Sequence, residues 1–139
     1  MKISTSITGI DYQHLIDHLK TLESAGFSSV STQENRLNPF LPLSIAAAGS
    51  QALELKTSVA IAFARSPMVT AQIAWELARA SEGRFVLGLG SQVKSHIERR
   101  FSQPWSAPAI RMREVIQAIR AIWHSWSTGD RLDFSSEHF

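Results

Sequence analysis

Hydrophobic and polar positions along the chain alternate between short strand-like runs and longer helix-like runs. The strand-like runs cover residues 2–7, 27–32, 55–63 and 84–90, where apolar and β-branched residues stand between turn residues. A run with apolar residues three and four positions apart follows each of them, which predicts a helix after each strand. These helices are expected over residues 11–25, 41–52, 67–83 and from 108 onward, and residues 91–107 are expected to be irregular. The final residues, 132–139, return to strand-like alternation.

Capping residues fix the expected ends of these helices. Asp11 is placed to cap the first helix, and Ser66 followed by Pro67 is a strong start for the third. Gly26 and Gly83 are expected to end the first and third helices, because glycine adopts the left-handed conformation of a helix C-terminus easily. The expected core-facing stripes are Leu15, Leu19 and Leu22 in the first helix, and Leu41, Ile45 and Ala48 in the second.

Successive strand and helix units indicate an α/β protein with a parallel sheet, because parallel strands need a crossover connection. Two architectures compete, an open doubly wound sheet and a (β/α)8 barrel. A dinucleotide-binding open sheet would place its glycine fingerprint after the first strand, where only Gly9 occurs. The later "GLGSQV" has Val93 where the third glycine is required. A barrel needs about 200 to 250 residues, so four units would make half of one.

Composition narrows the function further. The chain has 139 residues, 44% of them hydrophobic, and a formal net charge of +2, which is typical of one globular domain and argues against nucleic acid as a partner. It has no cysteine, which excludes disulfides and thiol catalysis. Neither a signal peptide nor a membrane-length apolar run is present, so we expect a cytoplasmic protein without a membrane partner.

Candidate binding residues lie where the predicted strands end, as is usual in parallel α/β folds. After the fourth strand, the turn Gly90-Ser91-Gln92 offers backbone N–H groups and side-chain donors to an anion, with Lys94 nearby. The alternative is a tight turn followed by solvated cations. After the second strand, Glu34 is a candidate general base, or else a surface carboxylate paired with Arg36.

The histidines and serines support no catalytic assignment. His14 and His18 are four residues apart on one helix, a spacing that could hold a metal, but a polar helix face explains them better. No metal site is therefore predicted. No serine occupies a nucleophile elbow, so a Ser-His-Asp arrangement is not expected either, and the catalytic residues remain unknown.

The segment "ARSPMVTAQIAWELARASEGRFVLGLGSQVKSHIERRF", followed by "PW", resembles the luciferase-like monooxygenase superfamily. It is most similar to the branch that uses the deazaflavin coenzyme F420, as are "NPFLPLSIAAA" and "MREVIQAIRAIW". The resemblance extends over essentially all of residues 1–139. It implies a TIM barrel whose strand ends bind coenzyme F420, with hydride passing between the coenzyme and a small organic substrate.

The resemblance also implies roles for individual residues. The turn Gly90-Ser91-Gln92-Val93 would bind the phosphate-bearing tail of the coenzyme, with Lys94 close by. Glu34 and Asn35 would lie beside the deazaflavin ring. Ser58 and Val59 match the position of a non-proline cis peptide behind that ring. Many relatives have a histidine in the loop after the second strand, and none lies between residues 31 and 40 here.

Two alternatives to an F420-dependent oxidoreductase stay open. One is a monooxygenase dependent on flavin mononucleotide (FMN) with the same barrel, and the other is an inactive remnant or interaction protein. As the N-terminal half of a barrel, residues 1–139 would form a truncated domain with two unpaired edges and an apolar inner face, much of it from "SVAIAF". Such a half-barrel is expected to pair with a second copy, as a homo-oligomer, or with a separate second-half chain.

Overall fold

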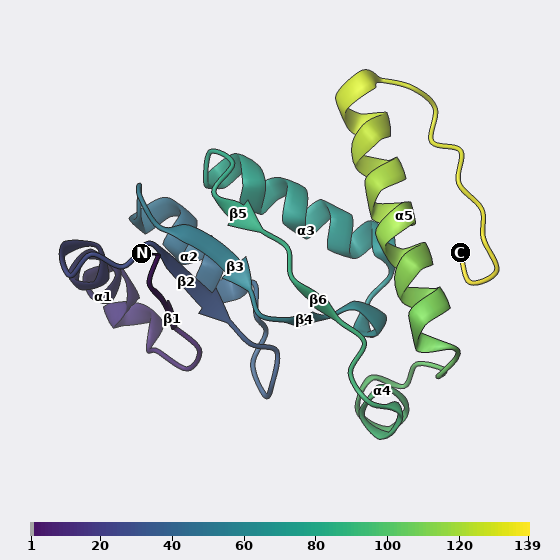
Figure 1. The fold of residues 1–139 in the computed structure, drawn as a ribbon, viewed down its shortest axis with the longest axis horizontal. Helices are drawn as coiled ribbons and strands as arrows, with labels where there is room; N and C mark the ends of the chain where they lie inside the picture. The colour runs from purple at the N-terminus through teal and green to yellow at the C-terminus, as the bar shows by residue number, and fades with distance from the viewer. Residues whose placement is uncertain (1) are drawn as a thin grey trace. The chain divides into compact units, whose positions relative to one another are not determined.

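The computed structural model describes residues 2–139 and contains an α/β fold with short parallel strands (Figure 1). The strands are β1 (Ser4–Ser6), β2 (Ser29–Thr32), β3 (Glu54–Thr57), β4 (Ala60–Ile61), β5 (Phe85–Val86) and β6 (Leu89–Gly90). The helices are α1 (Tyr12–Ser24), α2 (Leu41–Gly49), the 3-10 turn η1 (Ala62–Ala64), α3 (Pro67–Ala80), α4 (Lys94–Phe101) and α5 (Pro108–Thr128). None of these helices is both long enough and apolar enough to cross a membrane.

The chain divides into two compact units, and the dividing line runs through α3. The first unit contains residues 2–60 and 76–89 and holds the main sheet. The second contains Ile61–Trp75 and Gly90–Phe139 and is mostly helical. The short strands β4 and β6, which pair with each other, contain the other two points at which the chain passes from one unit to the other.

The sheet of the first unit has four strands in the order β1-β2-β3-β5, all parallel. Each strand lies beside the one that precedes it in this order, with Ser4 opposite Ser29 and Leu55 opposite Phe85. The predicted α/β class and parallel sheet are therefore confirmed. The predicted strand starts also lie within two residues of the observed ones for these four strands.

The two faces of this sheet differ in character. Because side chains alternate along a strand, Val30 and Leu55 share one face, and both are fully buried. The other face carries Ser29 opposite Glu54, and Lys56 on the same strand as Glu54. The Lys56 amine donates to the Ser29 hydroxyl at 2.9 Å and lies 3.7 Å from a Glu54 oxygen. The expectation of an apolar face open to water was wrong for these strands, because that face is polar.

The strands predicted over 55–63 and 84–90 are each interrupted. The first stops at Thr57 and resumes at Ala60, and the second stops at Val86 and resumes at Leu89. The expectation that "SVAIAF" exposes its apolar side chains was also wrong, because residues 60–63 are at most 3% exposed. Within that segment Val59 is the exposed large side chain, at 44%.

Helix α1 begins and ends where the sequence predicts. The Asp11 carboxylate accepts the N–H of Gln13 at 3.0 Å, and Gly26 follows the helix in the left-handed conformation. The stripe Leu15, Leu19 and Leu22 is buried.

The stripe predicted for helix α2 was wrong, because its buried residues are Pro42, Leu43, Ala46 and Ala47. Leu41 is 54% exposed instead. The helix sequence, LPLSIAAAG, is apolar on nearly every side, so periodicity alone could not select the buried face. The helix also ends at Gly49, three residues earlier than predicted.

The second unit departs most from the sequence prediction. Residues 94–101, expected to be irregular, form α4, which buries Ile97. Ser66 caps α3 as predicted, its hydroxyl accepting the Val69 N–H at 3.3 Å. The last segment, residues 129–139, forms no strand.

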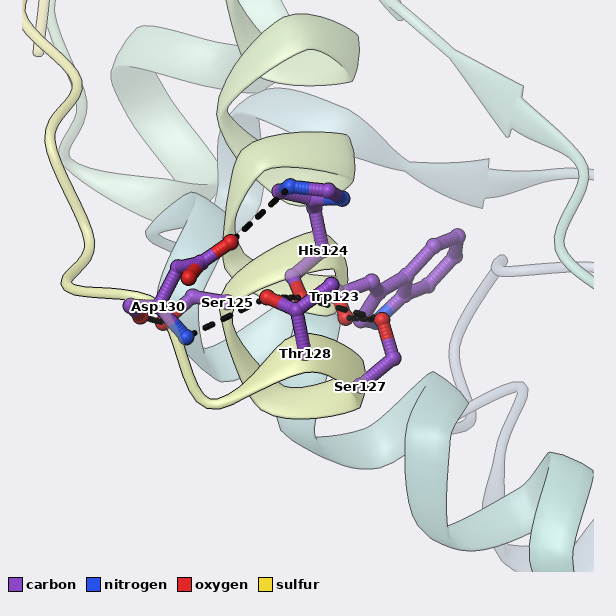
Figure 2. Close-up of polar contacts among 6 residues, drawn as sticks. All are labelled: Trp123, His124, Ser125, Ser127, Thr128 and Asp130. Atoms are coloured by element: carbon purple, nitrogen blue, oxygen red, sulfur yellow. Dashed lines mark hydrogen bonds and ion pairs between the residues drawn. The ribbon is translucent and has the colours of Figure 1, made fainter.

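Helix α5 ends in a network of local polar contacts (Figure 2). The hydroxyls of Ser127 and Thr128 both donate to the carbonyl of His124 at 2.9 Å. Gly129 then turns the chain with φ +82°, and Asp130 returns to within 3.6 Å of the His124 ring. These contacts are local, because they join residues at most six positions apart.

Candidate functional site

The carboxyl ends of the parallel strands bring polar residues together at one edge of the first unit. Thr8 follows β1, Glu34 follows β2, and Ser58 with Val59 follows β3. Register fixes this grouping, because β1, β2 and β3 pair in parallel with their carboxyl ends level. This edge is where parallel α/β proteins bind their ligands.

The loops after β1 and β2 are tied together by Thr8 and Gln33. The Gln33 N–H donates to Thr8 Oγ1 at 2.9 Å, and that hydroxyl donates to Gln33 Oε1 at 2.8 Å. The Ser6 hydroxyl accepts the Thr8 N–H at 3.2 Å and donates to the same Gln33 oxygen at 3.1 Å. Each hydroxyl accepts one backbone N–H and has its own proton left to donate, which identifies the carboxamide oxygen as the group it meets. Sequence reasoning missed this cluster because Gln33 lies 25 or more residues from Ser6 and Thr8.

Glu34, Ser58 and Val59, three of the predicted site residues, lie together. The Glu34 N–H donates to the Val59 carbonyl at 3.2 Å, and the Ser58 N–H donates to the Thr32 carbonyl at 2.7 Å. The peptide between Ser58 and Val59 is cis, as the family resemblance implies. Glu34 is only 6% exposed, so its interpretation as a surface carboxylate was wrong.

Asn35, the fourth predicted residue of this group, lies in the wall of a hollow of about 360 Å³. Thr8, Arg36 and Leu37 form the rest of the wall. The hollow therefore lies between the loop after β1 and the loop after β2. It combines a hydroxyl, an amide, a guanidinium and an apolar side chain.

The predicted anion-binding turn, residues 90–94, belongs to the second unit. Gln92 adopts a left-handed conformation with φ +60°, and its side-chain oxygen accepts the Val93 N–H at 3.0 Å. The Ser91 hydroxyl donates to the Gln92 carbonyl at 3.2 Å. Among the residues of this predicted anion-binding turn, Val93 therefore has its N–H bonded within the turn. Lys94 lies 3.9 Å from Glu98, an exposed pair one helical turn away.

A second cluster in the second unit joins α5 to the last residues of the chain. The Glu114 carboxylate lies 2.7 Å from the His138 ring nitrogen and also accepts the Ser136 hydroxyl at 3.2 Å. Burial raises the pKa of Glu114, but the hydrogen bonds from His138 and Ser136 outweigh it and leave the pKa lowered. Glu114, Glu137 and His138 place potential metal-ligand atoms within 4.8 Å of one another.

Within residues 2–139, Glu114, Glu137 and His138 form the one group of three or more potential metal ligands. His14 and His18 do not belong to it. The sequence did not indicate this cluster, because Glu114 lies 24 residues before His138.

Arg111 is a buried cation that the sequence did not single out. It is 8% exposed, its guanidinium lies 4.6 Å from the centre of the Phe63 ring, and it donates to the Pro104 carbonyl at 2.5 Å. Phe63 also meets Trp105 edge to face, with ring centres 6.1 Å apart. Burial lowers the pKa of Arg111, which still remains charged at neutral pH. These contacts fix the start of α5 against η1.

The chain is similar to a defined group of oxidoreductases. The family model for luciferase-like monooxygenases matches residues 2–139. An uncharacterized protein of Mycobacterium tuberculosis is 49% identical over 123 residues, which cover 88% of this chain and 36% of that protein. Another protein of that organism, with the provisional name of a coenzyme F420-dependent oxidoreductase, is 35% identical over 73% of this chain and 29% of its own length. The chain thus spans about a third of the length of the relatives that it matches.

Solved structures share the fold at low sequence identity. The oxygenating component of 3,6-diketocamphane monooxygenase from Pseudomonas putida, in complex with FMN, superposes with a TM-score of 0.82 at 16% identity, over 100% of this chain and 43% of that one. The coenzyme F420-dependent tetrahydromethanopterin reductase of Methanopyrus kandleri gives a TM-score of 0.77 at 18% identity, over 97% of this chain and 42% of that one.

Proposed function

The chain belongs to the luciferase-like monooxygenase family, and from this premise we propose that it is part of an oxidoreductase that uses coenzyme F420. In such an enzyme the coenzyme supplies the hydride chemistry when bound, and a small organic molecule is its partner in the reaction. The observation that carries the proposal is the polar carboxyl edge of β1, β2 and β3, where Glu34, Ser58 and Val59 are held together by backbone hydrogen bonds. The 35% identical relative, which is named as a coenzyme F420-dependent oxidoreductase, supports the choice of coenzyme.

The residues of the first unit are proposed to bind the ring of the coenzyme. Glu34 and Asn35 would lie beside it, and Ser58 with Val59 would lie behind it. Val59, 44% exposed, offers an apolar surface to a flat ring. Glu34 is anchored through its backbone to the Val59 carbonyl, so the two sides of this proposed site are fixed relative to each other.

The turn of the second unit is proposed to bind the phosphate-bearing tail of the coenzyme. Gly90, Ser91 and Gln92 would contribute backbone N–H groups, and Lys94 would contribute charge. Because the Val93 N–H is bonded to the Gln92 side chain, Val93 would shape the turn rather than contact the phosphate. The proposed phosphate site therefore consists of Gly90, Ser91 and Gln92 together with the cation of Lys94.

A half-barrel is the proposed architecture around this site. The strand order β1-β2-β3-β5 follows the chain, as in a barrel, whereas a doubly wound sheet reverses its order near the middle. Within residues 2–139, β1 and β5 each have a neighbour on one side only in this sheet. We propose that further β/α units complete the barrel, supplied by a second copy or by a separate chain, and that the cytoplasm is its location.

FMN is the second candidate coenzyme, favoured by the fold shared with the FMN-bound monooxygenase component. An inactive half-barrel is the third possibility. A titration separates the three: the protein is mixed with coenzyme F420 and with FMN, and fluorescence and absorbance are followed. Saturable binding of coenzyme F420 at a lower concentration than FMN supports the proposal. Tighter binding of FMN favours a flavin monooxygenase, and binding of neither, by a well-folded oligomer, favours the inactive protein.

A fusion tests the architecture separately. Residues 1–139 are joined to the C-terminal part of the 49% identical relative, and coenzyme binding is compared with that of the unfused chain. We expect the fused protein to be monomeric and to bind the coenzyme more tightly, because the added strands would cover both edges of the sheet. A fused protein that still associates through the same sheet edges would contradict the half-barrel.

A further inference from the structure

We propose that the hollow lined by Thr8, Asn35, Arg36 and Leu37 binds the carboxylate group of the organic substrate, so that the substrate is an organic acid. The inference names a substrate class for the oxidoreductase proposed above, and it therefore rests on that proposed function. The carboxylate site itself is defined by these four residues alone. Its volume of about 360 Å³ suits a small organic molecule.

The position of the hollow suits a substrate. It lies between the loops that follow β1 and β2, at the carboxyl edge of the sheet where Glu34 and the Ser58–Val59 peptide also lie. Asn35 is the next residue after Glu34, so a molecule in the hollow lies beside the residues proposed to bind the coenzyme ring. A bound acid and the ring would thus be neighbours.

The walls of the hollow are held in place without a ligand. Thr8 is bonded to Gln33 through two hydrogen bonds of 2.8 and 2.9 Å, and Gln33 also accepts the Ser6 hydroxyl. The loop with Arg36 is anchored at its other end, where the Asn38 side chain accepts the Phe40 N–H at 2.8 Å. A preformed wall reduces the entropy lost on binding.

The chemistry of the walls selects a carboxylate. Arg36 is exposed, and no ion pair joins it to a carboxylate anywhere in residues 2–139, so its guanidinium is available to a ligand. Guanidinium groups bind planar carboxylates through two parallel hydrogen bonds, and the Asn35 amide adds a further donor. Leu37, 53% exposed, provides apolar surface for the carbon chain of such an acid. A single cation matches a monoanion better than the double charge of a phosphate.

Hexanoate, hexanol and inorganic phosphate are the probes for this site. Each is titrated into the isotopically labelled protein, and the NMR shifts of the Thr8 and Asn35 amides report binding in the hollow. We expect hexanoate to bind about tenfold more tightly than hexanol or phosphate, as one charge-assisted hydrogen-bonded pair provides. Equal affinity for hexanoate and hexanol, or tighter binding of phosphate, would overturn the proposal, as would shifts confined to residues outside the hollow.

Variants at Arg36 identify the group responsible. Arg36→Met should lower hexanoate affinity about tenfold and leave hexanol affinity unchanged. The hexanoate affinity of Arg36→Lys should lie between those of the wild type and Arg36→Met. Arg113→Met, at an exposed arginine of α5, is the matched control and should change neither. Unchanged hexanoate affinity in Arg36→Met, at an unchanged melting temperature, would refute the role of Arg36.

Coenzyme binding is measured on the same variants, which separates this inference from the proposed function. If coenzyme F420 binds and hexanoate does not, the carboxylate site is wrong and the coenzyme assignment stands. If hexanoate binds through Arg36 and neither coenzyme binds, the carboxylate site is correct and the proposed oxidoreductase function is wrong.

Discussion

Thr57 and Gly88 are hydrogen-bonded to each other in both directions. The Thr57 hydroxyl donates to the Gly88 carbonyl at 2.8 Å and accepts the Gly88 N–H at 2.8 Å. The Gly88 carbonyl also accepts the backbone N–H of Ala60 at 2.9 Å, so the Thr57 side chain bonds to Gly88 in addition to backbone, at the level where β3 and β5 both stop. The backbones are so close that a Cβ atom at Gly88 would lie 2.1 Å from the Thr57 carbonyl oxygen.

Adding a methyl group at Gly88 is expected to destabilise the protein. Gly88→Ala must push the two backbones apart, which we expect to lower the free energy of unfolding by about 1–3 kcal/mol. Thr57→Val, which keeps the shape but removes both hydrogen bonds, should cost about 1–2 kcal/mol. Urea unfolding measures both. Thr57→Ser retains the hydroxyl and serves as the control, and a Gly88→Ala protein as stable as the wild type would show that the close approach is absent.

Glu23 is expected to make stability depend on pH. Its carboxylate accepts the Ser50 hydroxyl at 2.6 Å and the Ala52 N–H at 3.1 Å. The Ser50 hydrogen bond lowers the pKa of Glu23, against the opposing effect of burial. A lowered pKa in the folded state means that the stabilisation is complete above the ordinary pKa of 4.5 and is lost as the pH falls through the folded value.

Replacement of Glu23 by Gln should therefore matter at neutral pH and not in acid. We expect Glu23→Gln to lower the free energy of unfolding by about 1 kcal/mol at pH 7, with the difference from wild type shrinking below pH 4.5. Urea unfolding at a series of pH values measures this. Glu76→Gln, at an exposed position of α3, is the control. A difference that stays constant from pH 7 into acid would show that the carboxylate charge is not responsible.

The regular part of the fold was predictable because its signals are local. Asp11, Ser66 and Gly26 mark helix ends through bonds or conformations that involve only their nearest neighbours. The interruption of β3 and β5 was not predictable, because it depends on Thr57 meeting a glycine 31 residues later. Helix α4 escaped notice because "KSHIERRF" has only Ile97 and Phe101 as apolar residues, too few to show a period.

For the candidate site, too, the local features were predictable from the sequence and the features that depend on tertiary packing were not. Glu34 was identified from its place after a strand, but its burial depends on tertiary packing that spacing does not reveal. Thr8 and Gln33 look like ordinary loop residues until the parallel pairing of β1 with β2 brings them together. At Val93 the sequence suggested a free amide, because no pattern indicates that the neighbouring Gln92 side chain turns back to bind it.

Arg111 is expected to stabilise the second unit through Phe63. Arg111→Lys loses the flat guanidinium that lies 4.6 Å from the Phe63 ring, and we expect the free energy of unfolding to fall by about 1–2 kcal/mol. A double-mutant cycle with Phe63→Leu measures the interaction by urea unfolding. Arg113→Lys, at an exposed position on the same helix, should have no effect. Simple additivity of the Arg111 and Phe63 changes would contradict a direct contribution from their contact.

The Glu114–His138 contact is expected to hold the end of the chain against α5. The Glu114 carboxylate accepts the His138 N–H at 3.1 Å in addition to its 2.7 Å contact with the ring. His138→Ala should therefore raise the pKa of Glu114 toward its ordinary value, since the ring no longer lowers it, while burial and the hydrogen bonds from Ser136 and the backbone N–H of residue 138 remain. NMR titration of the Glu114 carboxyl carbon measures the change. The Glu137→Gln variant is the control, and a Glu114 pKa unaffected by His138→Ala would show that the contact does not persist in solution.

Gln33 is expected to act as a positioning residue for the loop that contains Thr8. Gln33→Leu removes the oxygen that accepts the Ser6 and Thr8 hydroxyls, so amide hydrogen exchange at Thr8 should accelerate about three- to tenfold. Gln33→Glu keeps an accepting oxygen and should restore slow exchange. The amide of Leu55, bonded to the Arg84 carbonyl at 2.9 Å within the same unit, should exchange at the wild-type rate in both variants. Acceleration at Leu55 equal to that at Thr8 would mean that Gln33 supports the whole unit, because a positioning residue affects only the loop that it holds.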